Sequence, residues 1–407
     1  MKKEILQNGL TVVTEEIEHA NSASLGIWVM AGSRGETREE AGISHFLEHM
    51  NFKGTERRNA KELAEVLECR GGQLNAYTTK EYTAYYCQVV GEDWPLGLDV
   101  LSDLYLNSTF EPEDIEKEKN VIIEEINLYE DSPEDLAVDL LNGVIWGEHP
   151  LSRPILGYED VVNSLNREKL LNYRHKNYTP GNTVLAAVGK IEHDALVEAA
   201  AKHFAGFQGV TESKNEPRPL CHSGKVSQVK DIMQEHICLG FPGLSIFDQD
   251  YYALILVNEI LGGGSASRLF QTIREERALS YSVFSFVTAY KDCGMLSVYA
   301  GTAKGKGNEV ADLCLGEIAN LKKEGVSPED LAKLKTQISG GMRISLDSLG
   351  SRLSRLGRNQ LYYGKDLPID EVVAHLNRVT PDDMVRVATD YLSEEQMAYA
   401  FLGGKEE

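Results

Sequence analysis

Two histidines with a glutamate between them occur in the segment GISHFLEHMNFKG, residues 42–54. His45 and His49 are four positions apart, so on an α-helix their side chains project from one face about one turn apart. Two imidazole nitrogens that converge in this way suit a zinc ion, which binds nitrogen at about 2.0–2.1 Å. Glu48 lies beside the same point without being needed as a ligand, and it could take the proton of a zinc-bound water.

A zinc site that does chemistry needs three protein ligands and one open position. The segment EKEKNVIIEEINLYE, residues 116–130, offers carboxylates on a predicted helix. Glu118 and Glu125 are seven positions apart and share one face, whereas Glu124 lies about 100° away and is better explained by exposure to solvent. One of the pair would complete the metal site, and the other would fix a histidine from behind. The spacing leaves open which is the ligand, and a solvated acidic helix face is the alternative for either.

The elements that must position these residues follow from hydrophobic periodicity. Alternating patterns predict strands at 10–17, 22–33, 73–79, 82–90 and 182–191. Helical patterns cover the motif itself, 59–70, most of 93–146 and 192–204. Pro112 and Pro133 fit the first turns of helices within the long tract. Residues 208–225 are polar, aperiodic and contain Pro and Gly, which indicates a linker.

The same order of elements returns after the linker. FEPEDIEKEK at 110–119 matches VSPEDLAKLK at 326–335, and NTVLAAVGKI at 182–191 matches QMAYAFLGGK at 396–405. We therefore predict an α+β protein with two homologous domains, each a sheet with helices on it. The predicted domains are an N-terminal metal-binding domain at 1–207, the linker at 208–225, and a C-terminal homologous domain at 226–407 that lacks the metal motif.

The repeat provides an internal control for the metal hypothesis. Aligning Gly54 with Gly264 places three second-half residues opposite the motif: Ile255, Asn258 and Glu259. The offset of the first repeat match places Leu334 opposite Glu118 and Gly341 opposite Glu125. Residues needed only to build the fold should recur in both halves. The polar set occurs in the first half alone, which favours a chemical role.

Composition excludes some classes of function. The formal charge of −22 argues against a nucleic-acid-binding protein, whose affinity depends on neutralising phosphates. The acidic surface is explained by solubility, with attraction of basic peptides as the alternative. The six cysteines form no Cys-x-x-Cys pair, which fits a reducing compartment. No export signal or membrane-spanning run is visible, so we expect a cytoplasmic protein.

The segments HFLEHMNFKGT, GGQLNAYTTKEYTAYY and EKNVIIEE together resemble the pitrilysin and mitochondrial processing peptidase family of inverted zincins, whose helix motif has the order His-x-x-Glu-His. In the second half, GGGSASRLFQTIREERALSYSVFS resembles that family's Arg and Tyr segment. The likeness covers nearly all 407 residues in order, as in a short two-domain member of bacterial type. One departure is Asn51, where relatives commonly have an apolar residue, and we expect it to alter only local packing.

The resemblance implies roles for individual residues. It makes Glu125 the third ligand of one Zn²⁺ per chain and Glu118 the residue that holds a histidine. It makes Asn75 and Ala76 part of an edge strand that binds extended substrate. It also implies that Arg274 and Tyr281 assist catalysis.

The implied activity is zinc-dependent endopeptidase cleavage of peptides or unstructured polypeptide segments, in which Glu48 activates the water. Because long family members close four such units into a chamber, the resemblance implies a clamshell-like homodimer in which Arg274 and Tyr281 act in trans. Neither nucleic acid nor membrane is an expected partner. The alternative is a non-catalytic peptide-binding or partner subunit of a processing peptidase complex, although such a subunit would typically have lost part of the His-Glu-His-Glu set. A structural zinc protein is disfavoured, because structural sites usually have four protein ligands.

Overall fold

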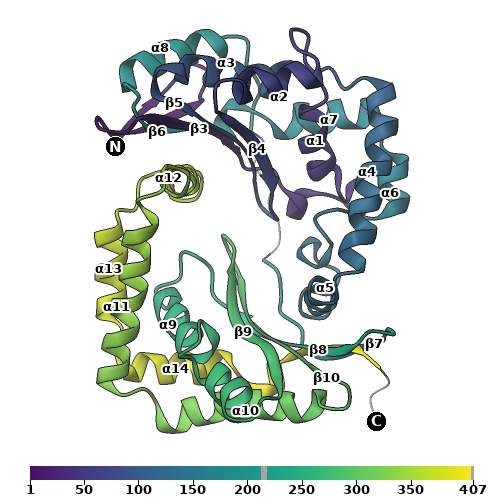
Figure 1. Ribbon diagram of the computed structural model, residues 1–407, viewed down its shortest axis with the longest axis vertical. Coiled ribbons are helices and arrows are strands. Elements are labelled where there is room, and N and C mark those ends of the chain that lie inside the picture. Colours follow the sequence, from purple (N-terminus) through teal and green to yellow (C-terminus); the bar gives the residue numbers. More distant parts are fainter. Residues whose placement is uncertain (212–217, 405–407) are drawn as a thin grey trace. The chain divides into compact units, whose positions relative to one another are not determined.

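The computed structural model describes residues 1–211 and 218–404. The chain forms two compact units. Figure 1 shows the chain with colours that follow the sequence. The first unit comprises Met1–Ile126, Pro154–Asn215 and Arg343–Leu367. The second unit comprises Asn127–Arg153, Glu216–Met342 and Pro368–Glu407.

The first unit is built on a six-stranded sheet with the order β1-β2-β6-β3-β5-β4. Its strands are β1 (Lys2–Ile5), β2 (Thr11–Glu16), β3 (Ser22–Val29), β4 (Gln73–Thr78), β5 (Thr83–Val90) and β6 (Thr183–Gly189). All neighbouring pairs are antiparallel except β2 and β6, which run parallel. Among the described residues, β4 pairs with β5 alone, so it forms one edge of the sheet.

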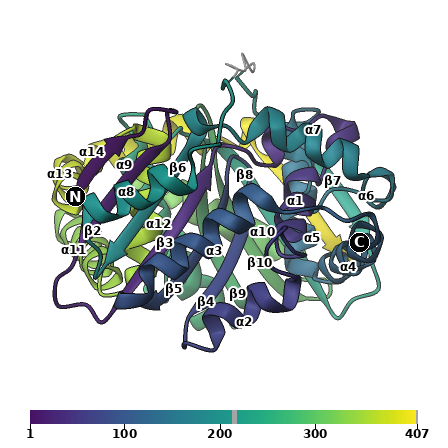
Figure 2. The same ribbon diagram turned by 90° about the horizontal axis from the view of Figure 1, so that it is seen from above.

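Alternating side chains divide this sheet between two cores. Val12 and Leu25 belong to the core under α3 (Trp94–Asn107) and α8 (His193–His203), which lie across the strands in Figure 2. Val13 and Trp28 point to the opposite face, where Leu353 and Leu356 of α12 (Leu349–Tyr363) cover them. This period of two is the pattern expected for strands buried on both faces.

The remaining helices of the first unit surround the motif. They are α1 (Ile43–Asn51), α2 (Ala60–Glu68), α4 (Pro112–Glu130), α6 (Glu159–Ser164) and α7 (Arg167–Asn177). α1 begins after Gly42, whose φ of 94° lies in the left-handed region that glycine adopts without strain. The boundary between the two units falls near the C-terminal end of α4.

The second unit repeats the architecture with a five-stranded sheet. Its strands are β7 (Gly224–Val229), β8 (Gln234–Gly243), β9 (Ser280–Ala289), β10 (Gly294–Ala303) and β11 (Ala398–Gly403). Its main helices are α9 (Tyr251–Gly262), α10 (Gly307–Glu324), α11 (Pro328–Ser345), α13 (Ile369–Arg378) and α14 (Pro381–Tyr391), and it also receives α5 (Pro133–Trp146). The order β7-β11-β8-β10-β9 corresponds strand for strand to β2-β6-β3-β5-β4. The predicted α+β fold with two homologous sheet-and-helix halves is therefore confirmed.

The helix positions reproduce the repeat of the sequence, but the compact units are not continuous halves. α4 begins at Pro112 and α11 at Pro328, a difference of 328 − 112 = 216 residues. α5 packs on the second sheet and α12 on the first, so the units depart from the expected ranges 1–207 and 226–407 at these two segments. The physical reason is that each sheet has two apolar faces that must be covered. The helix on the second face comes from the other half of the sequence: α5 of the first half covers the second sheet, and α12 of the second half covers the first. Of the expected linker 208–225, residues 212–217 lie outside the described residues, and 218–223 form no helix or strand.

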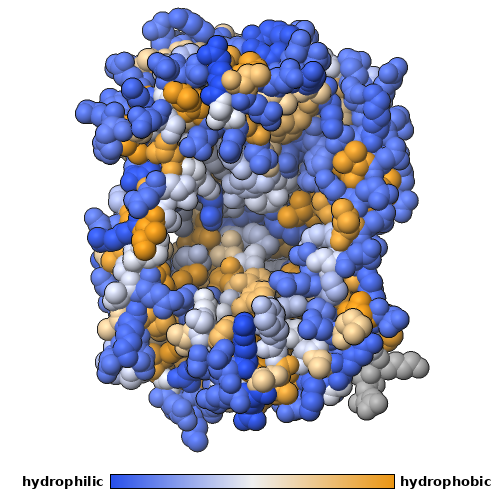
Figure 3. Space-filling model, viewed as in Figure 1, coloured by the Kyte–Doolittle hydropathy of each residue, from blue (hydrophilic) through white to orange (hydrophobic). Residues whose placement is uncertain are grey.

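Hydrophilic residues predominate on the face shown in Figure 3, in keeping with the charge of −22. Within the described ranges, the helices are all too short or too polar to cross a bilayer.

Candidate metal centre

The first unit brings the two motif histidines to a carboxylate of α4. Nε2 of His45 lies 3.8 Å from Oε2 of Glu125, and Nε2 of His49 lies 3.6 Å from the same oxygen. The three potential ligand atoms are all within 4.8 Å of one another. Tetrahedral zinc with bonds of about 2.0–2.1 Å places its ligand atoms about 3.3 Å apart. The donor set and its spacing therefore fit a zinc ion after a small closure of the side chains.

Glu118 contacts the other nitrogen of His49. Its Oε1 lies 2.8 Å from Nδ1 of His49, and its Oε2 lies 2.5 Å from Nζ of Lys53. Burial raises the pKa of Glu118, but the hydrogen bonds from His49 and Lys53 outweigh burial and leave that pKa below its usual value. A charged carboxylate at this place fixes the ring so that Nε2 faces Glu125. Glu118 and Glu125 thus occupy different positions around His49, a distinction that their spacing in the sequence left open.

The histidines differ in their tendency to take up a proton. Burial, followed by the neighbouring His49, lowers the pKa of His45 to about 3, so its imidazole is neutral over the physiological range. Burial also acts to lower the pKa of His49, but the hydrogen bond with Glu118 and the charge of Glu125 raise it above its usual value overall. A neutral imidazole is the form that binds a metal. His45 therefore has the form that a metal requires, whereas the carboxylates around His49 favour its taking up a proton.

Glu48 lies on α1 beside this cluster, and its side chain is buried. Oγ1 of Thr78 donates a hydrogen bond of 2.5 Å to its Oε2. Burial raises the pKa of Glu48, and the hydrogen bond from Thr78 opposes that rise only in part. A carboxylate with a raised pKa is suited to accept and then release a proton. The sequence predicts Thr78 only as the end of the edge strand Asn75–Thr78, and nothing in the pattern signals its contact with Glu48.

Asn75 and Ala76 lie on the edge strand β4, as expected. They pair with Tyr86 and Tyr85 of β5, and no strand in the described residues pairs with the other side of β4. Asn75 is exposed, and its Oδ1 accepts a hydrogen bond of 2.8 Å from the backbone N–H of Ala76. An unpaired strand edge offers backbone donors and acceptors to an extended peptide. Thr78, at the end of the same strand, connects this edge to Glu48.

Arg274 and Tyr281 belong to the second unit and contact each other there. Nη1 of Arg274, in the π-helix η6 (Phe270–Glu275), donates a hydrogen bond of 2.9 Å to the backbone oxygen of Tyr281 on β9. The guanidinium carbon lies 4.6 Å from the centroid of the Tyr281 ring, and this tyrosine is 78% exposed. The pair is therefore held together while the tyrosine hydroxyl is available to a ligand or partner.

Asn51 on α1 and Glu259 on α9, the second-half residue aligned with His49, are not part of the cluster of potential ligands. Asn51 is fully buried, and its side-chain amide has no hydrogen-bond partner among the described residues. In α9, Oε1 of Glu259 accepts a hydrogen bond of 2.7 Å from Gln337 instead of facing two histidines. Within the described residues, the cluster of His45, His49 and Glu125 has no counterpart in the second unit.

The fold and this site define a protein of the inverted-zincin type, with the His-x-x-Glu-His order on one helix and a carboxylate from another. Residues 11–159 match the family model "Insulinase (Peptidase family M16)", and residues 164–338 match "Peptidase M16 inactive domain". The chain is 40% identical over 395 residues to "Uncharacterized zinc protease YmxG" of Bacillus subtilis, covering 97% of this chain and 96% of that protein. The chain belongs to peptidase family M16, as its resemblance to pitrilysin indicated.

A second relative and two solved structures are also similar to this chain. "Uncharacterized zinc protease SCO5738" of Streptomyces coelicolor is 35% identical over 96% of this chain and 87% of its own length. The fold matches a protease from Helicobacter pylori with a TM-score of 0.92 and 22% identity, over 99% of both chains. It also matches a peptidase M16 inactive domain from Pseudomonas fluorescens with a TM-score of 0.92 and 20% identity, over 100% of this chain and 98% of that one. At these identities the two structures support the fold alone.

Proposed function

We propose that this protein is a zinc-dependent metalloendopeptidase that hydrolyses peptides or unstructured polypeptide segments. The observation that carries the proposal is the convergence of two imidazole nitrogens and one carboxylate oxygen beside the buried acid Glu48. The edge strand β4 in the same unit supports a peptide substrate, because its free side can pair with an extended backbone. The relatives named zinc proteases support the same class of reaction.

In this proposal each residue has a defined part. His45, His49 and Glu125 hold one Zn²⁺ per chain, and Glu118 fixes His49 through Nδ1. When bound, zinc supplies a Lewis acid that lowers the pKa of a bound water toward neutrality. Glu48 takes the proton of the attacking water and passes it to the leaving amine.

Extended substrate lies along β4 at Asn75 and Ala76. A peptide there would be bound mainly through its backbone, so many sequences would be accepted. Thr78 aligns Glu48 with the peptide bond, because its hydroxyl bridges the strand and the acid.

Substitutions at the site test metal binding separately from turnover. Glu48→Gln should retain near-stoichiometric zinc and lose hydrolysis of a quenched peptide by at least about 100-fold, since it removes the proton acceptor alone. His45→Ala should lose both zinc and hydrolysis. The matched control is Glu124→Gln, which changes an exposed neighbour of Glu125 and should leave both unchanged. Hydrolysis by Glu48→Gln at the parent rate would remove Glu48 from the mechanism.

A second candidate is a non-catalytic peptide-binding or partner subunit of a processing peptidase complex. The match of residues 164–338 to a model described as inactive favours this alternative for the second half. The two candidates differ in one measurement, the turnover of a quenched peptide by zinc-loaded protein with and without a chelator. A peptidase loses turnover when the metal is removed, whereas a partner subunit binds the peptide without cleaving it.

We also propose that the working form is a homodimer with a clamshell-like chamber, in which Arg274 and Tyr281 of one protomer complete the site of its partner. Their mutual contact and the exposure of Tyr281 support a role outside their own packing. Hydrogen bonds from such residues to a developing oxyanion are worth about 2.7–4 kcal/mol per donor.

The six free cysteines support a cytoplasmic location.

A further inference from the structure

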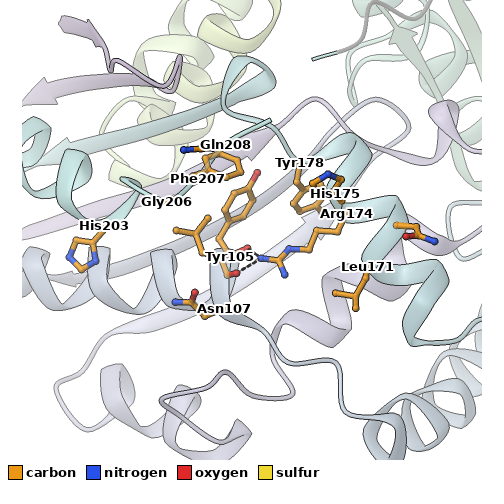
Figure 4. Close-up of a pocket in the computed structure, with 12 residues that line it drawn as sticks. Tyr105, Asn107, Leu171, Arg174, His175, Tyr178, His203, Gly206, Phe207 and Gln208 are labelled. Carbon is orange, nitrogen blue, oxygen red and sulfur yellow. Dashed lines mark hydrogen bonds between the residues drawn. The ribbon is translucent and has the colours of Figure 1, made fainter. Parts of the chain in front are cut away.

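The first unit contains a pocket that none of the proposed zinc ligands lines. Its volume is about 590 Å³, and it lies between the C-terminal ends of α3 and α7 and the residues that follow α8 (Figure 4). Arg174 and His175 come from α7, Tyr105 from α3, and Gly206 and Phe207 from the segment after α8. Three separate parts of the sequence therefore form it, and the proposed peptidase function leaves it unused.

The charge of the pocket differs from that of the rest of the protein. The chain has 63 acidic residues and a formal charge of −22. The described residues that line the pocket include Arg174, His175 and His203 but neither aspartate nor glutamate. A concave surface with cationic and hydrogen-bonding groups and no carboxylate favours a negatively charged ligand.

Arg174 has the hydrogen-bonding capacity for such a ligand. Its Nη2 donates to the backbone oxygens of Tyr105, at 2.8 Å, and Leu106, as Figure 4 shows for Tyr105. Nε and Nη1 have no hydrogen-bond acceptor, and no carboxylate lies within ion-pair distance, among the described residues. Burial lowers the pKa of Arg174, because a partly buried cation without a counter-ion is destabilised. Each of these two donors can give one charge-assisted hydrogen bond to an anionic oxygen.

The wall beside Arg174 is apolar. Leu106 and Leu171 line it and are partly exposed, and Phe207 lies beside them with 9% of its surface exposed. The rings of Tyr105 and Tyr178 are stacked on each other with centroids 5.3 Å apart and are almost fully buried, so they support this wall from behind. A wall of this kind favours an apolar group, which is removed from water by the contact.

We propose that this pocket is a binding site for a small organic anion that carries a carboxylate on an apolar body. The guanidinium of Arg174 pairs with the carboxylate, and the apolar body lies against the apolar wall. Among the described lining residues Arg174 is the one arginine or lysine, so the pocket suits a monoanion better than a multiply charged phosphate.

Calorimetric titration of the full-length protein with benzoate, benzamide and inorganic phosphate tests the proposal. Benzoate should bind saturably at one site per chain, and at least about tenfold more tightly than benzamide or phosphate, because benzamide lacks the charge and phosphate lacks the apolar body. Arg174→Gln should weaken benzoate by at least about tenfold and leave benzamide unchanged. Since Arg174 also bonds carbonyls at the end of α3, its loss can disturb folding, so a second variant is needed.

Gly206→Leu is the second variant, because it fills the pocket without altering Arg174. No atom lies within 4 Å of the position that a Cβ would take at Gly206. Benzoate binding should therefore fall by at least about tenfold in a protein that still folds. The matched control is Gly316→Leu on α10, where a Cβ also meets no atom within 4 Å, and this variant should bind benzoate as the parent does.

Benzoate could also bind a zinc ion, so the titration is repeated with His45→Ala protein, in which binding should persist. The proposal is overturned if benzoate does not bind saturably, or binds no better than benzamide or phosphate. It is equally overturned if binding is unchanged in Gly206→Leu or lost in His45→Ala.

Discussion

Glu36 determines how the helix that carries His45 and His49 begins. Its Oε2 accepts a hydrogen bond from the backbone N–H of Gly42, and its Oε1 accepts one from that of Ser44, both at 2.8 Å. The first N–H groups of a helix have no partner within the helix, so a carboxylate placed there satisfies them. Because Ser44 directly precedes His45, this contact also fixes the backbone at His45.

Glu36 gives the stability of the protein a dependence on pH. Burial raises the pKa of Glu36 from 4.5 to about 7, against the opposing effect of the hydrogen bonds from Ser44 and Gly42. Between these two pH values the folded state binds more protons than the unfolded state, so the free energy of unfolding falls as pH rises. At about 1.36 kcal/mol per pKa unit, the loss approaches ~3 kcal/mol.

We expect Glu36→Gln to remove this dependence. With metal stripped from both proteins, the parent should lose up to about 3 kcal/mol of stability relative to the variant between about pH 4.5 and pH 7. The difference should then stay constant at higher pH. Urea unfolding of both proteins at a series of pH values measures it. A difference that does not change across the window would contradict the assigned pKa of Glu36.

The sequence could predict only some of these residues. His45, Glu48 and His49 follow from local spacing, because one helix positions all three. Glu118 and Glu125 share a face of α4, so their distinct positions depend on how α4 packs against α1. Contacts such as those of Glu36 and Thr78 join distant segments, and no periodicity in the sequence signals them.

At the scale of elements, α12 packs closely on the first sheet because it has a glycine at the contact. A Cβ at Gly357 would lie 2.4 Å from the ring of Trp28, which is buried between the sheet and the helix. The sequence predicts the amphipathic helices, but an apolar stripe does not specify which sheet it covers. The pattern therefore does not predict the exchange of α5 and α12 between the halves.

Gly357→Ala should destabilise the protein by about 1–3 kcal/mol, because the rigid indole cannot move away from the added methyl group. The intrinsic preference of helices for alanine, roughly 0.5–1 kcal/mol, opposes this loss. The control is Gly350→Ala in the same helix, whose Cβ would meet only Oγ of Ser348 at an ordinary 3.6 Å. Urea unfolding should show a lower midpoint for Gly357→Ala alone. An unchanged or higher midpoint would show that the helix does not pack this closely on Trp28.

At the scale of the whole molecule, the same arrangement of strands and helices occurs twice, but the two units carry different candidate functional residues. The two sheets share their strand order, which the sequence repeat predicted. Within the described residues, the metal cluster belongs to the first unit, whereas the Arg274–Tyr281 pair belongs to the second. Divergence of the two halves in this way suits a division of tasks between metal chemistry and substrate contacts. The sequence alone does not decide whether the cooperating units come from one chain or two.

Mixing two inactive proteins tests whether Arg274 and Tyr281 act across a homodimer. One protein carries Glu48→Gln, and the other carries Arg274→Ala with Tyr281→Phe. After subunit exchange, a heterodimer contains one site in which an intact metal centre meets an intact Arg–Tyr pair, so random exchange should restore about a quarter of the parent activity per chain. As a control, the same double variant mixed with His45→Ala protein should recover the same fraction, because the defect again lies in the first unit. Arg277→Ala, an exposed neighbouring arginine, should remain active without mixing. Heterodimers that form without regaining activity would show that each chain supplies its own Arg274 and Tyr281.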